Sequence, residues 1–322
     1  MFVATAVEAE RATYAGSTPL REGAGVLALM EATAGTWPRL ASVLRDAGSA
    51  LAVAEGRATV IGRDASRARA LAGRVDPDEL DDWASVLRQV LDRSPGTRFV
   101  PVTSDEYPGS LAELADCPPF LFVRSQQPLD ALPPTVAVVG SRASSPEGRL
   151  LAREVAAHLA RTGSTVVSGL ALGIDAEAHA ACLQAGAPTV ASLPSGVDRI
   201  YPEEHKDLAG QIARQGALVS RFWPDAPPRR DSFRLRNAVT SGIAVATVVI
   251  EAGPTSGARM QARIAAAQGR PVILMGHLVR REPWARKAAG RRGMLVAESP
   301  EEVAEAIRAA APQVRPRQLA LF

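Results

Sequence analysis

Short runs of β-branched and aliphatic residues recur between residues 135 and 275, and the segments between them carry apolar residues at helical spacing. The apolar runs predict strands at 135–139, 165–168, 189–193, 217–221, 244–250 and 271–275. Helices are predicted at 147–161, 176–186, 206–215 and 258–268. Continuous apolar runs are typical of strands buried on both faces, and their alternation with helices is typical of a mostly parallel sheet. The pattern therefore predicts an α/β core with helices on both faces of the sheet.

The first 95 residues have a different pattern. Apolar residues recur there at intervals of three and four, as in Trp83, Val86, Leu87 and Val90. This spacing predicts helices with one apolar face. The sequence SPGT at 94–97 interrupts the pattern, so we expect a small all-α domain at 1–95, an α/β domain at 96–311 and a flexible tail at 312–322.

The composition narrows the class of protein. The 322 residues are 47% hydrophobic and 22% charged, which excludes an intrinsically disordered chain. No apolar run is long enough to span a bilayer, and the first residues do not resemble a secretory signal, so we expect a cytoplasmic protein with no membrane partner. Cys117 and Cys182 have neither CxxC spacing nor neighbouring histidines. We therefore expect no disulfide, metal or cofactor.

Charge is unevenly distributed along the chain. From residue 201 to the end there are 19 Lys and Arg against 11 Asp and Glu, a net charge of +8, whereas the whole chain carries +3. A basic half made mostly of arginine suggests a polyanionic partner, because guanidinium groups match phosphate and stack on bases. A GC-rich genome produces the same arginine bias, so composition alone leaves the partner open.

The loop after the first predicted strand could bind phosphate. Gly140, Ser141 and Arg142 lie between that strand and a helix. Backbone N–H groups, the helix dipole and a guanidinium would all favour an anion there. The loop matches neither the dinucleotide fingerprint GxGxxG nor the nucleoside-triphosphate fingerprint GxxxxGK[ST]. A plain strand-to-helix turn is an equally good interpretation.

A second candidate loop follows the next strand. It contains Ser168, Gly169, Ala171 and Gly173, and its glycines would allow a ligand to approach the backbone. Asp175 is expected to cap the following helix rather than to bind a ligand. The role of His179, one turn further on, stays open.

A third candidate is the segment FWPDAPPRRDSFRLRN at 222–237, which interleaves aromatic rings with Arg229, Arg230, Arg234 and Arg236. Cations that neutralise phosphates and rings that stack on bases are what a surface for single-stranded nucleic acid requires. The alternative is a solvated loop whose rings pack in the core. Four arginines in eight residues favour the anionic polymer.

A fourth candidate is the segment EAGPTSG at 251–257, which closes a very apolar strand. Ser256 and Gly257 could cap the next helix and bind an anion, and Glu251 could accept hydrogen bonds from a sugar or a base. A turn with a structural carboxylate is an equally good interpretation.

Taken in order, these loops resemble the DNA-processing protein A (DprA, or Smf) family, whose core is an extended Rossmann fold. The matching segments are SDEYPGSLAELADCPPFLFVR at 104–124, VAVVGSRASSPEGR at 136–149, VVSGLALGIDAEAH at 166–179, GVDRIYPEEH at 196–205, GALVS at 216–220, FRLRN at 233–237 and TSGARMQARIA at 255–265. The resemblance covers about 200 residues with ordered spacing. It implies that residues 1–95 form a SAM-like helical domain before the core.

The resemblance also implies a function. Family members are dimeric proteins that bind single-stranded DNA and help load the recombinase RecA during natural transformation or recombination, and they are not enzymes. Residues that match the family's DNA pocket are Arg142 in the GSR loop together with Ser168, Gly169, Ala171, Arg236 and Asn237. We therefore expect a nucleic-acid site at these positions and no catalytic residues.

The chain departs from the family's motifs at several positions. Leu172 stands where SGxARGID has its arginine, and Ala238 stands at the second arginine of FPxRNR. Arg234 and Arg259 are additional arginines. Because phosphate contacts dominate affinity for nucleic acid, the pocket is expected to bind DNA more weakly or in another register.

The end of the chain suggests another partner. The family's C-terminal winged helix is not expected here, because the last predicted helix ends near residue 311. The final residues QLALF resemble the peptide by which bacterial proteins dock on the DNA polymerase sliding clamp, with Gln318, Leu319, Leu321 and Phe322 as its contacts. The alternative is a tail that folds back onto the core.

Two other functions compete with the recombination mediator. A nucleotide sensor or adaptor would keep the fold while its DNA pocket has drifted, and the missing arginines favour it. A phosphoribohydrolase resembling the cytokinin-activating LOG family would need PGGxGTxxE, whereas the corresponding loop reads AGPTSG at 252–257 and lacks the downstream glutamate.

Overall fold

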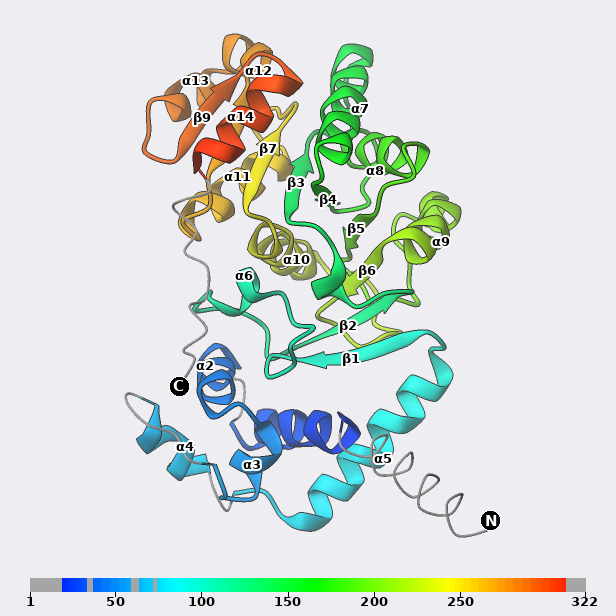
Figure 1. The fold of residues 1–322 in the computed structure, drawn as a ribbon, viewed down its shortest axis with the longest axis vertical. Coiled ribbons are helices and arrows are strands. Elements are labelled where there is room, and N and C mark those ends of the chain that lie inside the picture. Colours follow the sequence, from blue (N-terminus) through cyan, green and yellow to red (C-terminus); the bar gives the residue numbers. More distant parts are fainter. Residues whose placement is uncertain (1–18, 34–36, 59–63, 72–73, 311–322) are drawn as a thin grey trace, which may run out of the picture. The chain divides into compact units, whose positions relative to one another are not determined.

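The structure, a computed structural model, describes residues 19–33, 37–58, 64–71 and 74–310. The chain divides into two compact units (Figure 1). The first comprises residues up to 107 together with 115–121, and the second comprises 108–114 together with the residues from 122 onward. Residues 96–107 therefore cluster with the helical unit.

The first unit is mainly helical, as its apolar spacing predicts. Its elements are a helix at 19–32, α2 (Trp37–Ala47), α3 (Ala50–Ala54), α4 (Ala65–Leu71), α5 (Pro77–Arg93) and the strand β1 (Thr97–Pro101). In α5 the buried side chains are Leu80 and Leu87, whereas Val86 is 41% exposed. The predicted apolar face of this helix was therefore wrong at Val86, because leucines seven residues apart set the buried side.

The second unit is built on one sheet. Its strands are β2 (Phe120–Ser125), β3 (Thr135–Val139), β4 (Thr165–Ser168), β5 (Thr189–Ser192), β6 (Ala217–Ser220), β7 (Ala246–Val249), β8 (Val272–Met275) and β9 (Met294–Ala297). Within this unit they run in the order β2-β6-β5-β4-β3-β7-β8-β9. β2 pairs antiparallel with β6, and the pairs from β6 to β9 are parallel. The mostly parallel sheet is confirmed.

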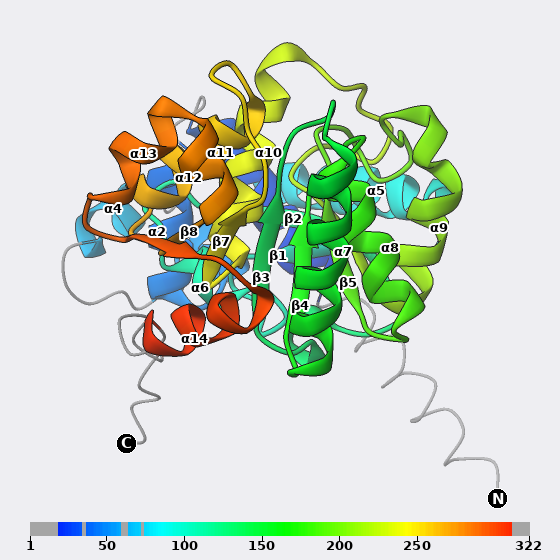
Figure 2. The same ribbon diagram turned by 90° about the horizontal axis from the view of Figure 1, so that it is seen from above.

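Helices cover both faces of this sheet (Figure 2). They are α6 (Gly109–Ala112), α7 (Pro146–Arg161), α8 (Ile174–Gln184), α9 (Lys206–Gln215), α10 (Arg230–Ile243), α11 (Gly257–Ala267), α12 (Gly276–Arg281), α13 (Pro283–Ala289) and α14 (Pro300–Ala310), with 3-10 turns η1 (Leu129–Ala131) and η2 (Glu203–His205). α7, α8, α9 and α14 lie on one face, and α10 and α11 lie on the other.

Alternation along β7 shows how the sheet is buried. Val248 packs in a cluster with α7, α8 and α14, whereas Val249 packs in a second cluster with α11, α12 and α13. Both side chains are fully buried. A strand whose successive residues enter two different cores is buried at every position and favours apolar and β-branched residues, which is the pattern that predicted it; Thr247 of β7 is buried as well.

Some predicted boundaries move by two residues. The helix predicted at 176–186 is α8, and it begins at Ile174 because Gly173, with φ +77°, ends the loop before it. The strand predicted at 244–250 is limited to Ala246–Val249. Within the described part of the chain, no helix combines the length and the apolar character needed to cross a membrane.

His179 in α8 lies in the core of the second unit. Its Nδ1 is 2.8 Å from Thr189 Oγ1, which itself donates a hydrogen bond to the Val166 carbonyl at 2.8 Å. A hydroxyl has one hydrogen, so Nδ1 must be the donor to Thr189. Burial, together with the nearby charges of His205 and Arg236, lowers the pKa of His179 to about 3. The ring is therefore a neutral core residue that carries its proton on Nδ1.

This neutral histidine should make folding sensitive to acid. Its folded pKa lies below the unfolded value near 6.5, so its contribution is fully present above pH 6.5 and is lost as the pH falls towards 3. We expect the wild-type protein to lose about 2 kcal/mol more unfolding free energy between pH 7 and pH 5 than His179→Asn. Urea unfolding at the two pH values measures both losses, and equal losses would contradict the assignment.

Candidate nucleic-acid site

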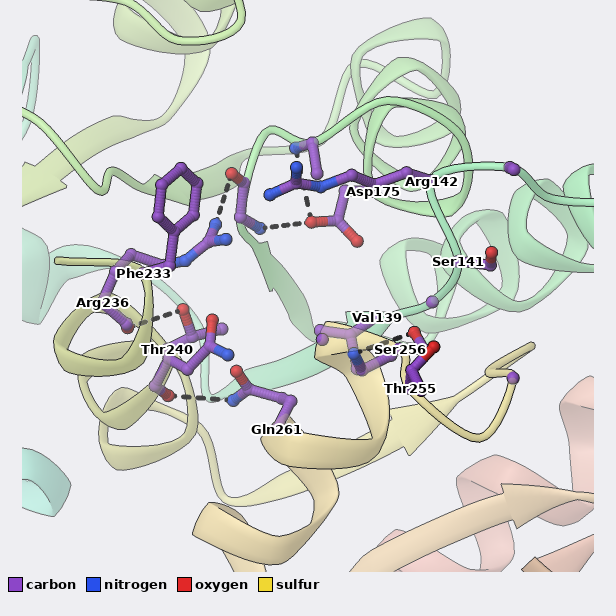
Figure 3. A pocket seen from close by; sticks show the side chains of 18 residues that line it. Val139, Ser141, Arg142, Asp175, Phe233, Arg236, Thr240, Thr255, Ser256 and Gln261 are labelled. Atoms are coloured by element: carbon purple, nitrogen blue, oxygen red, sulfur yellow. Dashed lines mark hydrogen bonds between the residues drawn. The ribbon is translucent and has the colours of Figure 1, made fainter. Parts of the chain in front are cut away.

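A pocket of about 510 Å³ lies beyond the carboxyl ends of β3, β4 and β7 (Figure 3). Nine of the predicted nucleic-acid residues line it: Gly140, Ser141, Arg142, Gly169, Ala171, Arg236, Asn237, Ser256 and Gly257. Three others, Ser168, Gly173 and Arg234, do not line it. Loops that are far apart in the sequence converge because parallel strands end at the same edge of a sheet.

Arg142 is the exposed cation of this pocket. Its guanidinium carbon lies 5.2 Å from the centroid of the Phe233 ring. The edge of that ring meets Tyr201, with centroids 5.6 Å apart. A guanidinium over an aromatic face gains about 0.5–1 kcal/mol at an exposed site. Arg142 forms no salt bridge with any described residue, so its charge is available to a ligand.

Arg236 has a different environment. It is 6% exposed, and its Nη1 donates hydrogen bonds to the carbonyls of Gly169 and of Ser192, the latter at 3.3 Å. Burial lowers the pKa of this guanidinium, and the charge of Asp175 opposes that effect. The side chain therefore joins α10 to the ends of β4 and β5, and most of its donors face the protein interior.

The loop after β4 is shaped around this arginine. A Cβ on Gly169 would collide with Arg236 Nη1, so a side chain there would displace the guanidinium from the Gly169 and Ser192 carbonyls. The next residue, Leu170, is fully buried with φ +57°, a conformation that costs a non-glycine residue about 1–3 kcal/mol. Its carbonyl accepts a hydrogen bond from His205 Nδ1 at 2.8 Å. Packing and this bond hold the strained conformation in place.

Asp175 stabilises the same loop by hydrogen bonds to its backbone. Its Oδ2 accepts hydrogen bonds from the backbone N–H groups of Gly169 at 3.1 Å and Ala171 at 3.4 Å. Burial raises the pKa of this carboxyl, against the lowering effects of Arg236 and of the backbone donors. The predicted role as helix cap was wrong, because Gly173 is the N-cap residue and Asp175 lies within the first turn of α8.

Two predicted residues hold the loops together instead of lining the pocket. Ser168 is buried, and its Oγ donates to the Val138 carbonyl at 2.6 Å, which links β4 to β3. Gly173 lies where a Cβ would be 2.5 Å from the Ser141 carbonyl. The close approach of these loops therefore depends on a small residue at 173.

The arginine-rich segment at 222–237 is divided in the structure. Arg230 and Arg234 are exposed on α10 outside the pocket, and Arg229 is the residue that precedes the helix. Arg236 alone of the four lines the pocket. Helical geometry accounts for this division, because Arg234 and Arg236 lie about 200° apart around the helix axis.

The loop after β7 provides the other wall of the pocket. Ser256 is the N-cap of α11 and accepts a hydrogen bond from the Ala258 N–H at 3.1 Å. Glu251 does not line the pocket. Its Oε2 accepts from the Ser145 N–H at 2.8 Å, and Ser145 is the N-cap of α7. The geometry therefore favours a structural role for Glu251.

Nine lining residues were absent from the predicted site: Val139, Ala143, Asp175, Phe233, Thr240, Gly253, Thr255, Ala258 and Gln261. Thr240 Oγ1 donates to the Arg236 carbonyl at 3.1 Å, and Gln261 Nε2 donates to the Asn237 carbonyl at 2.9 Å. Helical spacing was the available signal, because Phe233 and Thr240 lie on the same helix face as Arg236 and Asn237.

The pocket presents groups that can hold an anion. Among the described residues, no group of three or more His, Cys, Asp or Glu side chains could hold a metal ion. The pocket offers one exposed guanidinium, the hydroxyl groups of Ser141 and Thr255, the N-terminus of α11 and the Phe233 ring. These groups suit an anion attached to an aromatic or apolar body.

Comparison with known sequences agrees with this geometry. A family model described as DNA recombination-mediator protein A matches residues 98–306. Protein Smf of Escherichia coli is 38% identical over 218 residues, which cover 66% of this chain and 57% of the relative. DNA processing protein DprA of Bacillus subtilis is 31% identical over 213 residues, which cover 66% and 70%. The chain spans 45% of the Smf protein of Synechocystis, which is 35% identical over 179 residues.

Solved structures show the same fold. The X-ray structure of DNA processing protein A from Streptococcus pneumoniae is similar with a TM-score of 0.63 and 27% identity, covering 83% of this chain and 95% of that one. A DNA processing protein A from Helicobacter pylori, described for its single-stranded DNA binding mode, has a TM-score of 0.59 at 22% identity, covering 67% and 96%. The family match spans well over half of the chain, and this chain belongs to the DNA recombination-mediator protein A family.

Proposed function

We propose that the pocket binds the backbone of single-stranded DNA. The observation that carries this proposal is the convergence of the exposed Arg142 guanidinium and the α11 N-terminus on one pocket of about 510 Å³. Both groups favour phosphate, the first by charge and hydrogen bonding and the second by the positive end of its helix dipole.

Single strands suit this site better than duplex DNA. A flexible strand can place one phosphate and one base inside a pocket, whereas the bases of a duplex stay stacked on each other. The Phe233 ring and the apolar side chains of Val139 and Ala258 supply an apolar lining for a base. The Helicobacter pylori relative, described for its binding of single-stranded DNA, supports the same ligand class.

The wider role that we propose is that of a recombination mediator, acting in the cytoplasm as a homodimer that passes single-stranded DNA to a RecA-type recombinase. Membership of the DNA recombination-mediator protein A family supports this role. It is a binding role and not a catalytic one. The proposed clamp contacts Gln318, Leu319, Leu321 and Phe322 lie outside the described residues.

A mononucleotide sensor is the second candidate function. Arg142 is exposed, whereas Arg236 is buried. A pocket with one available guanidinium can neutralise one phosphate, which favours a mononucleotide. Competition of deoxynucleoside monophosphates against a 20-nucleotide oligothymidine separates the two. Binding of the monophosphate alone would support the sensor and contradict the mediator.

Arg142→Ala should weaken binding of single-stranded DNA. Each phosphate contact of a single strand contributes about 0.7 to the slope of log affinity against log salt, so we expect affinity at 0.1 M salt to fall about fivefold and the slope to decrease by about 0.7. Fluorescence anisotropy with a labelled oligothymidine over a salt series measures both quantities.

The matched control is Arg161→Ala. Arg161 is an exposed arginine in the last turn of α7, at the opposite end of the helix that follows Arg142. It should leave affinity and slope unchanged. Equal effects of the two substitutions would show that overall charge, and not the pocket, determines binding.

Arg236→Met should act on stability instead. It removes the hydrogen bonds to the Gly169 and Ser192 carbonyls and the positive charge that lowers the pKa of the buried Asp175, and leaving buried polar groups without partners costs about 1–3 kcal/mol. Urea unfolding at pH 7 should show this loss, and adding Asp175→Asn should recover part of it. Wild-type stability combined with a reduced salt slope would instead identify Arg236 as a phosphate ligand.

A further inference from the structure

A cluster of cations lies outside the pocket, on α12, α13 and the turn that follows them. Between residues 280 and 292 the chain has one acidic residue, Glu282. The six basic residues of this segment are Arg280, Arg281, Arg286, Lys287, Arg291 and Arg292. None of them lines the pocket, and the proposed function does not use them.

Two of these cations serve the fold. Arg280 Nη1 lies 2.7 and 2.9 Å from the two carboxylate oxygens of Glu298. Arg281 Nη1 lies 3.4 Å from Glu251 Oε1, the carboxylate that also accepts from the Ser145 N–H. Their charges are neutralised within the protein.

The other four, which we call the basic face, are Arg286, Lys287, Arg291 and Arg292. All four are exposed, and none pairs with a carboxylate of the described chain. Arg286 donates to the Arg280 carbonyl at 2.6 Å, which orients its guanidinium without neutralising it. Four like charges in seven residues repel one another, and a polyanion would relieve this repulsion.

The basic face is fixed to the wall of the pocket. Trp284 Nε1, in α13, donates to the Ala252 carbonyl at 2.9 Å. Arg259, in α11, stacks over the Trp284 ring at 5.6 Å and donates to the Pro254 carbonyl at 2.6 Å. Residues 252 and 254 belong to the loop whose later residues line the pocket. α13 therefore lies beside α11 (Figure 2). Arg291 and Arg292 follow it at the amino end of β9, so the basic face leads away from the pocket along this side of the sheet.

We propose that the basic face is a second part of the DNA site, which binds the phosphates of a single strand where it continues beyond the pocket. This inference rests on the proposed function. Trp284 is the one Trp, Tyr or Phe between residues 276 and 293. Arg259 already stacks on its ring, and its Nε1 already donates to the Ala252 carbonyl. The basic face thus contacts phosphates and not bases, which makes it independent of DNA sequence.

The length of the DNA distinguishes binding at the basic face from binding in the pocket, because a short oligonucleotide fills the pocket alone. The experiment compares a 5-nucleotide and a 20-nucleotide oligothymidine by anisotropy over a salt series. The variant is Lys287→Gln/Arg291→Gln/Arg292→Gln, which keeps Arg286 and its hydrogen bond. The matched control is Arg161→Gln/Arg214→Gln/Arg308→Gln, three exposed arginines in the last turns of α7, α9 and α14, on the face of the sheet opposite α11 and α13.

We expect the variant to bind the longer oligonucleotide more than tenfold more weakly at 0.1 M salt. Its salt slope should fall by about 2, because three phosphate contacts of a single strand contribute about 0.7 each. Affinity for the 5-nucleotide oligonucleotide should stay within twofold of the wild-type value. The control should bind both oligonucleotides like the wild-type protein.

Each outcome bears on the proposal. An unchanged slope for the longer strand, an equal loss on both lengths, or an equal loss in the control would overturn it. If the basic-face variant binds normally while Arg142→Ala is impaired, the proposed function stands and the second part of the site does not. If the wild-type protein binds neither oligonucleotide, both proposals fail.

Discussion

The buried guanidinium of Arg236 is the group on which the shape of the pocket depends. It brings α10 against the ends of β4 and β5 through the carbonyls of Gly169 and Ser192. A cation removed from water needs compensating dipoles and charge. Here the two carbonyls supply the dipoles, and Asp175 supplies the negative charge that opposes the effect of burial.

This arrangement separates two tasks between two arginines. The inner one, Arg236, binds the loop after β4, and a Cβ at position 169 would displace its guanidinium. The outer one, Arg142, stacks on the Phe233 ring, and its charge is exposed at the surface. Sequence alone does not distinguish them, because both belong to motifs that read as phosphate ligands.

The architecture could be predicted because it depends on a repeated pattern. Strands buried on both faces are rich in apolar and β-branched residues, so the six runs between residues 135 and 275 identified β3 to β8 within two residues at each end, and β3 and β4 without error. The strand at the antiparallel edge, β2, was not predicted. Its apolar residues 120–123 have the same pattern as the predicted strands. Its antiparallel pairing with β6, which links residues nearly 100 positions apart, does not follow from the alternation of strands and helices.

The sequence predicted which loops form the candidate site, but it did not predict which of their side chains are buried and which are exposed. The convergence of the loops follows from the direction of parallel strands, which is a property of the fold class. Burial of Arg236 and exposure of Arg234 depend on the phase of α10, which is set by its packing on the sheet. Thr240 and Gln261 were missed for the same reason, since both contact backbone carbonyls of α10.

Glu251 has a consequence for the route of a bound strand. Glu251 accepts the Ser145 N–H with one oxygen and pairs with Arg281 through the other, so a protein carboxylate already occupies the amino-terminal end of α7, where the helix dipole would otherwise attract an anion. The start of α11 carries only the Ser256 hydroxyl as its cap. The two helix starts that border the pocket therefore differ, and of the two the α11 start is the one open to an anion from outside the protein.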